Sequence, residues 1–68
     1  MPCMVFCLVN GEPVQLEVSA ETRAILRGVA LKTGQPIQNI LAPAFKKYGK
    51  REGSIVRYIR TDLAKERR

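Results

Sequence analysis

The chain has 68 residues, with 12 lysines and arginines against 6 aspartates and glutamates, and it contains no histidine or tryptophan. A chain of this length forms one small domain, and such a domain buries only ~60% of its unfolded surface. Because 46% of the residues are hydrophobic, we expect self-association to cover part of that surface. Histidine is the usual catalytic base near neutral pH, so its absence favours a protein that is not an enzyme and uses no cofactor.

The excess positive charge is confined to the last third of the sequence. Residues 1–44 carry three basic and three acidic side chains, whereas residues 45–68 carry nine basic and three acidic ones, which gives this segment the whole net charge of +6. Such an asymmetry indicates a polyanionic partner, with nucleic acid ahead of an anionic membrane. The alternative is a solvated basic surface that keeps the protein soluble. Tyr48 and Tyr58 lie among these cations, and Tyr48 fits a core stripe better than a base-stacking role.

The N-terminal segment does not have the pattern of a targeting signal. Residues 1–9 are apolar but lack a basic region before them, and no stretch approaches the ~20 apolar residues of a membrane span. We therefore expect no membrane partner and a cytoplasmic location. Cys3 and Cys7 would lie about 13 Å apart on one face of a strand. That distance is too long for a disulfide, and we expect free cysteines and no metal site.

Two strands are predicted at the start of the chain. Residues 3–9 (CMVFCLV) are apolar and rich in strand formers, and Asn10-Gly11 follows them. This dipeptide favours a type I′ turn, which requires positive φ at both central positions. Residues 13–18 (PVQLEV) alternate in polarity, which is typical of a half-buried strand. A hairpin with this turn places Phe6 opposite Gln15 and Met4 opposite Glu17. Alternatively, the first segment covers the core or pairs with another dimer.

Three helices are predicted after the hairpin. The first runs over residues 20–33, with Ser19 as its N-cap and Gly34 just after its last residue. The second begins at Gln35-Pro36, with the proline at the first helical position. Its apolar stripe is Ile37, Ile40, Leu41, Ala44, Phe45 and Tyr48. Pro43 is expected to kink or break this helix. Residues 49–53 read as a linker, and Ser54 is predicted to cap a short third helix over residues 55–66.

The order of strand, capped helix, turn and second helix resembles the ribbon-helix-helix family of DNA-binding proteins. The matching features are the VQLEV strand, the Ser19 cap, the LKTG end of the first helix, the Gln35-Pro36 start and the Ile37/Ile40/Leu41 stripe, over residues 13–48. The resemblance implies an α+β homodimer, here with an added N-terminal strand and a short third helix. Residues 1–53 would form the dimerisation and binding domain, and residues 54–68 a basic helix and tail. The expected dimer core is Val14, Leu16, Val18, Ile37, Ile40, Leu41 and Phe45.

The same resemblance implies how DNA would be bound. Outward side chains of the strand read bases in this family, which places Gln15 and Glu17 in that role; glutamine can bond adenine, and a carboxylate can accept from cytosine. The start of the second helix holds a phosphate in the family, which points to Gln35. Further candidates for phosphate contacts are basic residues: Arg23, Arg27, Lys46, Lys47, Lys50, Arg51, Arg57 and Arg60. For Arg23 and Arg27 the alternative is a solvated face of the helix. The function implied is that of a small dimeric transcriptional repressor.

A second hypothesis is a protein-protein interaction module of this fold, including an antitoxin-type one, that does not read DNA sequence. Its partner would bind the C-terminal helix or a hairpin face formed by Met4, Phe6 and Leu8. Exposure of these three side chains beside Gln15 and Glu17 would favour this second hypothesis, because an apolar surface suits a protein partner better than a charged groove.

Overall fold

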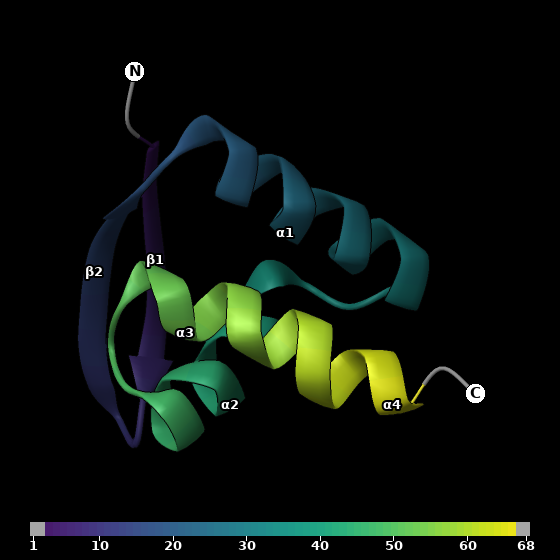
Figure 1. Cartoon of the computed structure of the whole chain (residues 1–68). Helices are drawn as coiled ribbons and strands as arrows, with labels where there is room; N and C mark the ends of the chain where they lie inside the picture. The colour runs from purple at the N-terminus through teal and green to yellow at the C-terminus, as the bar shows by residue number, and fades with distance from the viewer. Residues whose placement is uncertain (1–2, 67–68) are drawn as a thin grey trace.

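The computed structural model describes residues 3–66, and it is an α+β fold: an antiparallel hairpin followed by three helical segments (Figure 1). The strands are β1 (Cys3–Val9) and β2 (Glu12–Val18). The first two helices are α1 (Ala20–Thr33) and α2 (Ile37–Tyr48). The third segment is continuous and consists of α3 (Glu52–Arg57), the π-helix η1 (Tyr58–Leu63) and α4 (Ala64–Glu66). All the helices lie on one face of the hairpin, which leaves its other face uncovered by the described residues.

The hairpin turn has the predicted geometry. Asn10 and Gly11 have φ values of 54° and 83°, as a type I′ turn requires. The two strands pair antiparallel with Phe6 opposite Gln15 and Met4 opposite Glu17. Both features of the predicted hairpin are therefore confirmed.

The register also determines which backbone groups face outward. The residues that flank a two-residue turn form a hydrogen-bonded pair. Non-hydrogen-bonded and hydrogen-bonded pairs then alternate along the two strands. The backbone groups of Val14 and Leu16 consequently point toward β1, while those of Gln15 and Glu17 point toward the open edge of β2. Pro13 also lies in an outward position, where its missing N–H costs no ladder bond. On β1, the backbone groups of Met4, Phe6 and Leu8 point toward the open edge of the strand. Within residues 3–66 the sheet has only these two strands, so each strand has one edge without a strand neighbour.

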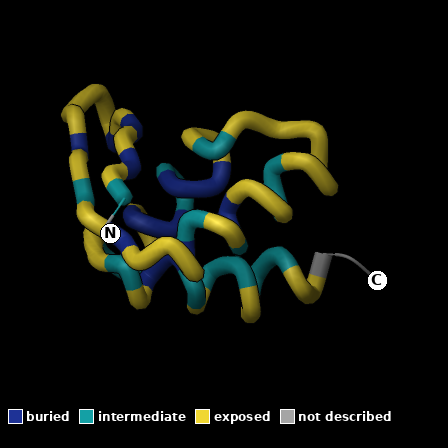
Figure 2. The backbone as a smooth tube through the Cα atoms, turned by 90° about the horizontal axis from the view of Figure 1, so that it is seen from above, coloured by how far each residue is buried: buried dark blue, intermediate teal, exposed yellow. Residues whose placement is uncertain are grey.

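The core lies between the inner face of the hairpin and the helices (Figure 2). Inward side chains of both strands are buried against α1, α2 and α3. The most buried of the core residues are Cys7, Val18, Leu26, Ile40, Leu41, Ala44, Phe45 and Ile55. Burial raises the pKa of the Cys7 thiol, and both cysteines are free. Of the seven residues expected in a dimer core, a single chain already buries all but Leu16 and Ile37, which are half-buried.

The ends of α1 are set by local capping, as predicted. The Ser19 hydroxyl oxygen accepts a hydrogen bond from the Thr22 amide at 3.2 Å. Gly34 adopts the left-handed conformation, with φ at 72°, and its amide donates to the Ala30 carbonyl at 2.9 Å. Glycine makes this conformation without a steric cost, which explains why the helix ends here.

The start of α2 differs from the prediction by one position. Pro36 is the N-cap, with ψ at 155°, and the first helical residue is Ile37. Gly34 ends α1, and Pro36 has the extended backbone conformation of the residue that precedes α2. The Pro36 carbonyl accepts from the Asn39 amide at 3.0 Å. The helix then continues through Pro43 to Tyr48, so the break considered at Pro43 does not occur.

The start of the third helical segment was predicted incorrectly. It begins at Glu52 rather than Ile55, and its N-cap is Arg51, which makes no side-chain capping bond. Ser54 is buried inside the helix, where its hydroxyl donates to the Tyr48 carbonyl at 2.8 Å. This bond ties the helix to the end of α2 instead of capping it. The expected division between residues 53 and 54 thus falls within α3, and residues 67–68 of the expected tail lie outside the described residues.

Candidate functional site

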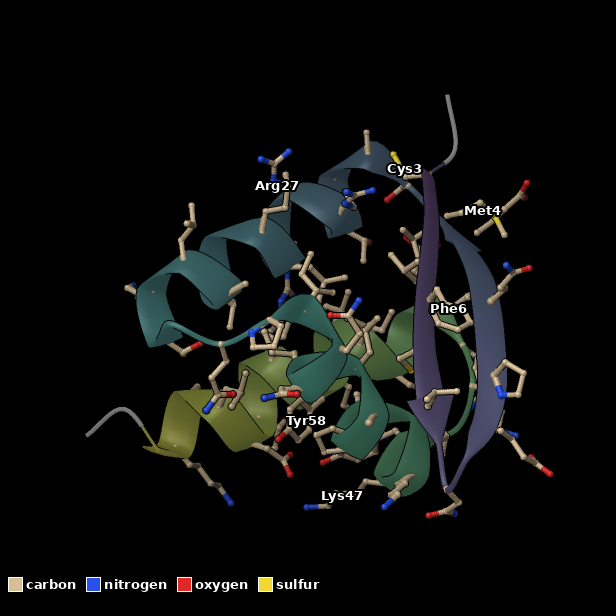
Figure 3. All side chains as sticks on the ribbon, turned by 180° about the vertical axis from the view of Figure 1, so that it is seen from behind. Cys3, Met4, Phe6, Arg27, Lys47 and Tyr58 are labelled. Atoms are coloured by element: carbon tan, nitrogen blue, oxygen red, sulfur yellow. The ribbon has the colours of Figure 1, made fainter. Side chains whose placement is uncertain are left out.

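The outward side of β1 carries three large apolar side chains. Met4, Phe6 and Leu8 are 53%, 46% and 57% exposed, and Figure 3 shows Met4 and Phe6 on the side of the sheet away from the helices. They alternate with buried neighbours on the same strand. An antiparallel strand with one face toward water normally carries polar side chains on that face. β1 is instead apolar on both faces.

The matching side of β2 is polar and acidic. Pro13, Gln15 and Glu17 lie opposite Leu8, Phe6 and Met4, and all three are exposed. We call these six side chains the outer hairpin face: Met4, Phe6, Leu8, Pro13, Gln15 and Glu17. The face has one carboxylate and no cation.

The two base-reading candidates therefore point outward as the family resemblance implies, but they lie within this face. Gln15 has Phe6 directly across the ladder, and Glu17 has Met4. A carboxylate in this position repels the phosphates that line a DNA groove. Exposed apolar side chains gain most when another apolar surface covers them. The composition of the face consequently suits a protein surface better than a major groove.

The cationic candidates do not form one surface. Arg27 on α1 and Lys47 on α2 lie at opposite ends of the molecule in Figure 3. Lys47 Nζ is 2.7 Å from Asp62 Oδ2, and Lys50 Nζ is 3.8 Å from Glu12 Oε1. Part of the positive charge is thus paired within the chain. The candidates Gln35, Lys46 and Arg60 are exposed.

Two cations contact the ring of Tyr48. The Arg57 guanidinium carbon is 4.9 Å from the ring centroid, and Lys47 Nζ is 5.5 Å from it. Both distances fit cation–π contacts. A pocket of about 310 Å³ beside this ring is lined by Tyr48, Arg51, Gly53, Ser54 and Arg57. The sequence favoured core packing for Tyr48; the ring is half-buried and makes these cation–π contacts.

Asp62 binds both Lys47 and Tyr48. Its Oδ1 accepts from the Tyr48 hydroxyl at 2.7 Å, while its Oδ2 binds Lys47. The bond from Lys47, and then that from Tyr48, lowers the pKa of Asp62 below its ordinary value. The same carboxylate raises the pKa of Lys47 and the pKa of Tyr48 by stabilising their protonated forms.

A second polar network joins the start of α3 to the start of α1. Glu52 Oε2 accepts from the Ser19 amide at 3.0 Å, from the Ser19 hydroxyl at 2.9 Å and from the Thr22 hydroxyl at 2.6 Å. The Thr22 bond, followed by those from Ser19, holds the pKa of Glu52 below its ordinary value. Glu52 was expected in a linker. Its partners are at least 30 residues away in the chain, so no local pattern points to this role.

The described residues contain no cluster of three or more histidine, cysteine, aspartate or glutamate side chains that could hold a metal ion. None of the helices in residues 3–66 is long and apolar enough to cross a membrane. Comparisons of the chain with models of known protein families, with curated protein sequences and with solved structures gave no match.

Proposed function

We propose that this chain is a small protein-interaction module that binds a partner protein through the outer hairpin face. The exposure of Met4, Phe6 and Leu8 beside Gln15 and Glu17 carries this proposal. Taking a side chain of this type from full exposure to full burial is worth about 1.5–3 kcal/mol. Because Met4, Phe6 and Leu8 are about half exposed, a partner with an apolar surface gains only about half of this energy per side chain. A cation at the rim of the partner would pair with Glu17.

We further propose that two copies associate through the open edge of β2, in an arrangement similar to the ribbon-helix-helix dimer. In the expected register, Gln15 of one copy lies opposite Glu17 of the second. Both residues have an N–H that points toward the other copy, and no two glutamates lie opposite each other. A register centred on Pro13 would lack a donor. The resulting four-stranded sheet has three strand spacings of ~4.8 Å and is too wide for a major groove of ~12 Å. This width is a further argument for a protein partner.

The test compares three forms of the full chain as affinity baits in extract from cells that produce it. The bait variants are the triple substitution Met4→Thr, Phe6→Thr and Leu8→Thr, and the matched control Leu31→Thr, which changes an apolar side chain that is 83% exposed on α1. We expect a protein that the unmodified and control baits retain and the triple variant loses. That protein, purified, should bind the triple variant at least about tenfold more weakly, which corresponds to ~1.4 kcal/mol.

Equal retention by all three baits, or equal affinity of the purified partner for the triple variant and the control, would contradict the proposal. Circular dichroism of each bait establishes that the hairpin variant is folded. Threonine is a strong strand former, so the substitutions change the face without opposing the strand.

DNA binding is the second candidate function. The contacts of Lys47 and Arg57 with the Tyr48 ring, and Arg51 in the adjoining pocket, favour it. The test is a salt titration of duplex DNA binding with the unmodified chain, with Gln15→Ala, and with Lys46, Lys47, Arg57 and Arg60 changed to glutamine. Loss of the cations should weaken binding to every sequence and flatten the salt dependence, whereas Gln15→Ala should relax sequence preference. An absence of binding at ~50 mM salt would exclude this candidate, because phosphate contacts are strongest at low salt.

A further inference from the structure

A small pocket lies beside the open edge of β1. It measures about 130 Å³ and is lined by Met4, Val5, Phe6, Arg23, Ile37 and Gln38. Arg23 comes from α1, and Ile37 and Gln38 form the start of α2. The pocket therefore joins the edge of the sheet to α1 and α2; two of its lining residues, Met4 and Phe6, are labelled in Figure 3.

Several hydrogen-bond donors at this edge lack a partner within the described residues. The Nε of Arg23 is buried and makes no hydrogen bond, which is costly for a charged donor. The N-cap of α2 provides no side-chain capping bond, and the first turn of α2 contains no acidic residue. The register leaves the amides of Met4 and Phe6 pointing outward from β1. The outward amides of Met4 and Phe6 and the guanidinium of Arg23 thus lie at the same pocket.

We propose that the edge of β1 receives an extended segment of the partner protein as an added strand, and that a carboxylate side chain of this segment binds Arg23. The inference rests on the proposed protein-binding function and specifies its partner. Side chains of an added strand alternate between the two faces of the sheet. One set would extend the apolar row of Met4, Phe6 and Leu8 on the outer face. The other set would point toward the pocket, where an aspartate or glutamate meets Arg23 and the positive end of α2.

The peptide backbone is what distinguishes this ligand from a nucleic acid. An added strand both donates to and accepts from the open edge of β1, which is the basis of strand addition in peptide recognition. A phosphate would satisfy Arg23 but would leave the outward carbonyls of the strand without donors. The apolar lining from Val5, Phe6 and Ile37 also suits an aliphatic stem that carries a carboxylate.

The first test removes a single N–H from the edge of β1. The full chain is made by chemical synthesis with N-methylated Phe6, and the matched control carries N-methylated Ala20, the exposed first residue of α1, where the helix needs no N–H donor. Both side chains are retained, and neither amide belongs to the β1–β2 ladder. The ligand is a library of nine-residue peptides with central glutamate and alternating β-branched residues. We expect N-methylation of Phe6 to weaken library binding at least about tenfold, and that of Ala20 to leave it unchanged.

The second test examines the carboxylate. Arg23→Gln should remove the preference for the glutamate library over the same library with central glutamine, while Arg27→Gln, one turn further along α1 and exposed, should retain it. This comparison also decides the matter if N-methylated Phe6 fails to fold. Equal binding of the two libraries to the unmodified chain, or equal binding to both arginine variants, would overturn the inference. So would displacement of the peptides by duplex DNA that depends on Arg23, because it would assign the pocket to phosphate.

The outcomes separate this inference from the proposed function. If the purified partner binds the Arg23→Gln and N-methylated Phe6 chains normally but fails to bind the Met4/Phe6/Leu8 variant, the added strand is wrong and the protein-binding function stands. If the partner also binds that triple variant normally, both are wrong.

Discussion

The two faces of β1 have similar side chains but different surroundings. Val5, Cys7 and Val9 on the inner face are at most 6% exposed, whereas Met4, Phe6 and Leu8 on the outer face are at least 46% exposed. β2 shows the ordinary pattern, with buried valines on one face and Gln15 and Glu17 on the other. Folding of a single chain thus explains the inner face of β1 and leaves the outer face without a folding role. This difference is the observation that supports the proposed binding of a protein by the outer face.

The largest expected effect concerns the layer that packs on the inner face. Leu41 on α2 is fully buried, so Leu41→Ala removes buried volume that its neighbours fill only in part. We expect a loss of about 2–5 kcal/mol in the free energy of unfolding. Leu31→Ala, at an apolar but exposed position, should change it by less than ~0.5 kcal/mol. Urea denaturation of both variants measures the contrast, and similar losses would contradict the assigned core.

A smaller effect separates neighbouring positions of β1. Val5→Thr places a hydroxyl in the core and should cost about 1–3 kcal/mol. Phe6→Thr makes an exposed position more polar and should cost less than ~1 kcal/mol. The measurement is again the unfolding free energy in urea. If Phe6→Thr were the more destabilising change, the outer face would have a structural role within the single chain.

The pH dependence of stability tests the bonds from Glu52 to Ser19 and Thr22. These bonds lower the pKa of Glu52 in the folded chain below its ordinary value of 4.5. The unfolded chain then takes up the proton first, so the stabilisation is complete above pH 4.5 and is lost as the pH falls through the folded pKa. Glu52→Gln should reduce the drop in melting temperature on acidification. Glu17→Gln, on the outer hairpin face, should leave that drop unchanged, and the same profile for both variants would contradict the role of Glu52.

The smallest expected effect is a shift in the titration of Tyr48. The bond to Asp62 raises the pKa of its phenol. Asp62→Asn removes the negative charge, so this pKa should fall toward its ordinary value. Ultraviolet titration in a Tyr58→Phe background follows Tyr48 alone, and Lys65→Gln is a control that changes a nearby charge without removing either hydrogen bond. An unchanged phenol pKa in Asp62→Asn would contradict the bond.

Local signals were enough to predict the hairpin and α1. The Asn10-Gly11 turn fixes the register, and Ser19 and Gly34 fix the ends of the helix, because each acts within four residues of its partner. The apolar row on β1 also follows from that register. The sequence alone left open whether this row is exposed, because the first segment could also have covered the core or paired with another dimer.

Features that depend on distant contacts could not be predicted in this way. α3 begins at Glu52 because that side chain binds Ser19 and Thr22 on α1, and Ser54 is buried against the end of α2. The π-helical turn over Tyr58–Leu63 has no recognisable sequence pattern. The position of Arg23 beside β1 and α2 likewise depends on how the helices pack. The sequence made Arg23 a candidate for phosphate contact, and no local pattern places it beside the edge of the sheet.

The central claim is that the outer hairpin face binds a protein, and site-specific photocrosslinking tests it most directly. The photoreactive residue p-benzoylphenylalanine replaces Phe6 in one form of the chain and Leu31 in another, and both are irradiated in cells that produce the protein. The account predicts a discrete adduct with a different protein from position 6 and none from position 31. Adducts with nucleic acid from position 6, or the same protein adducts from both positions, would contradict it.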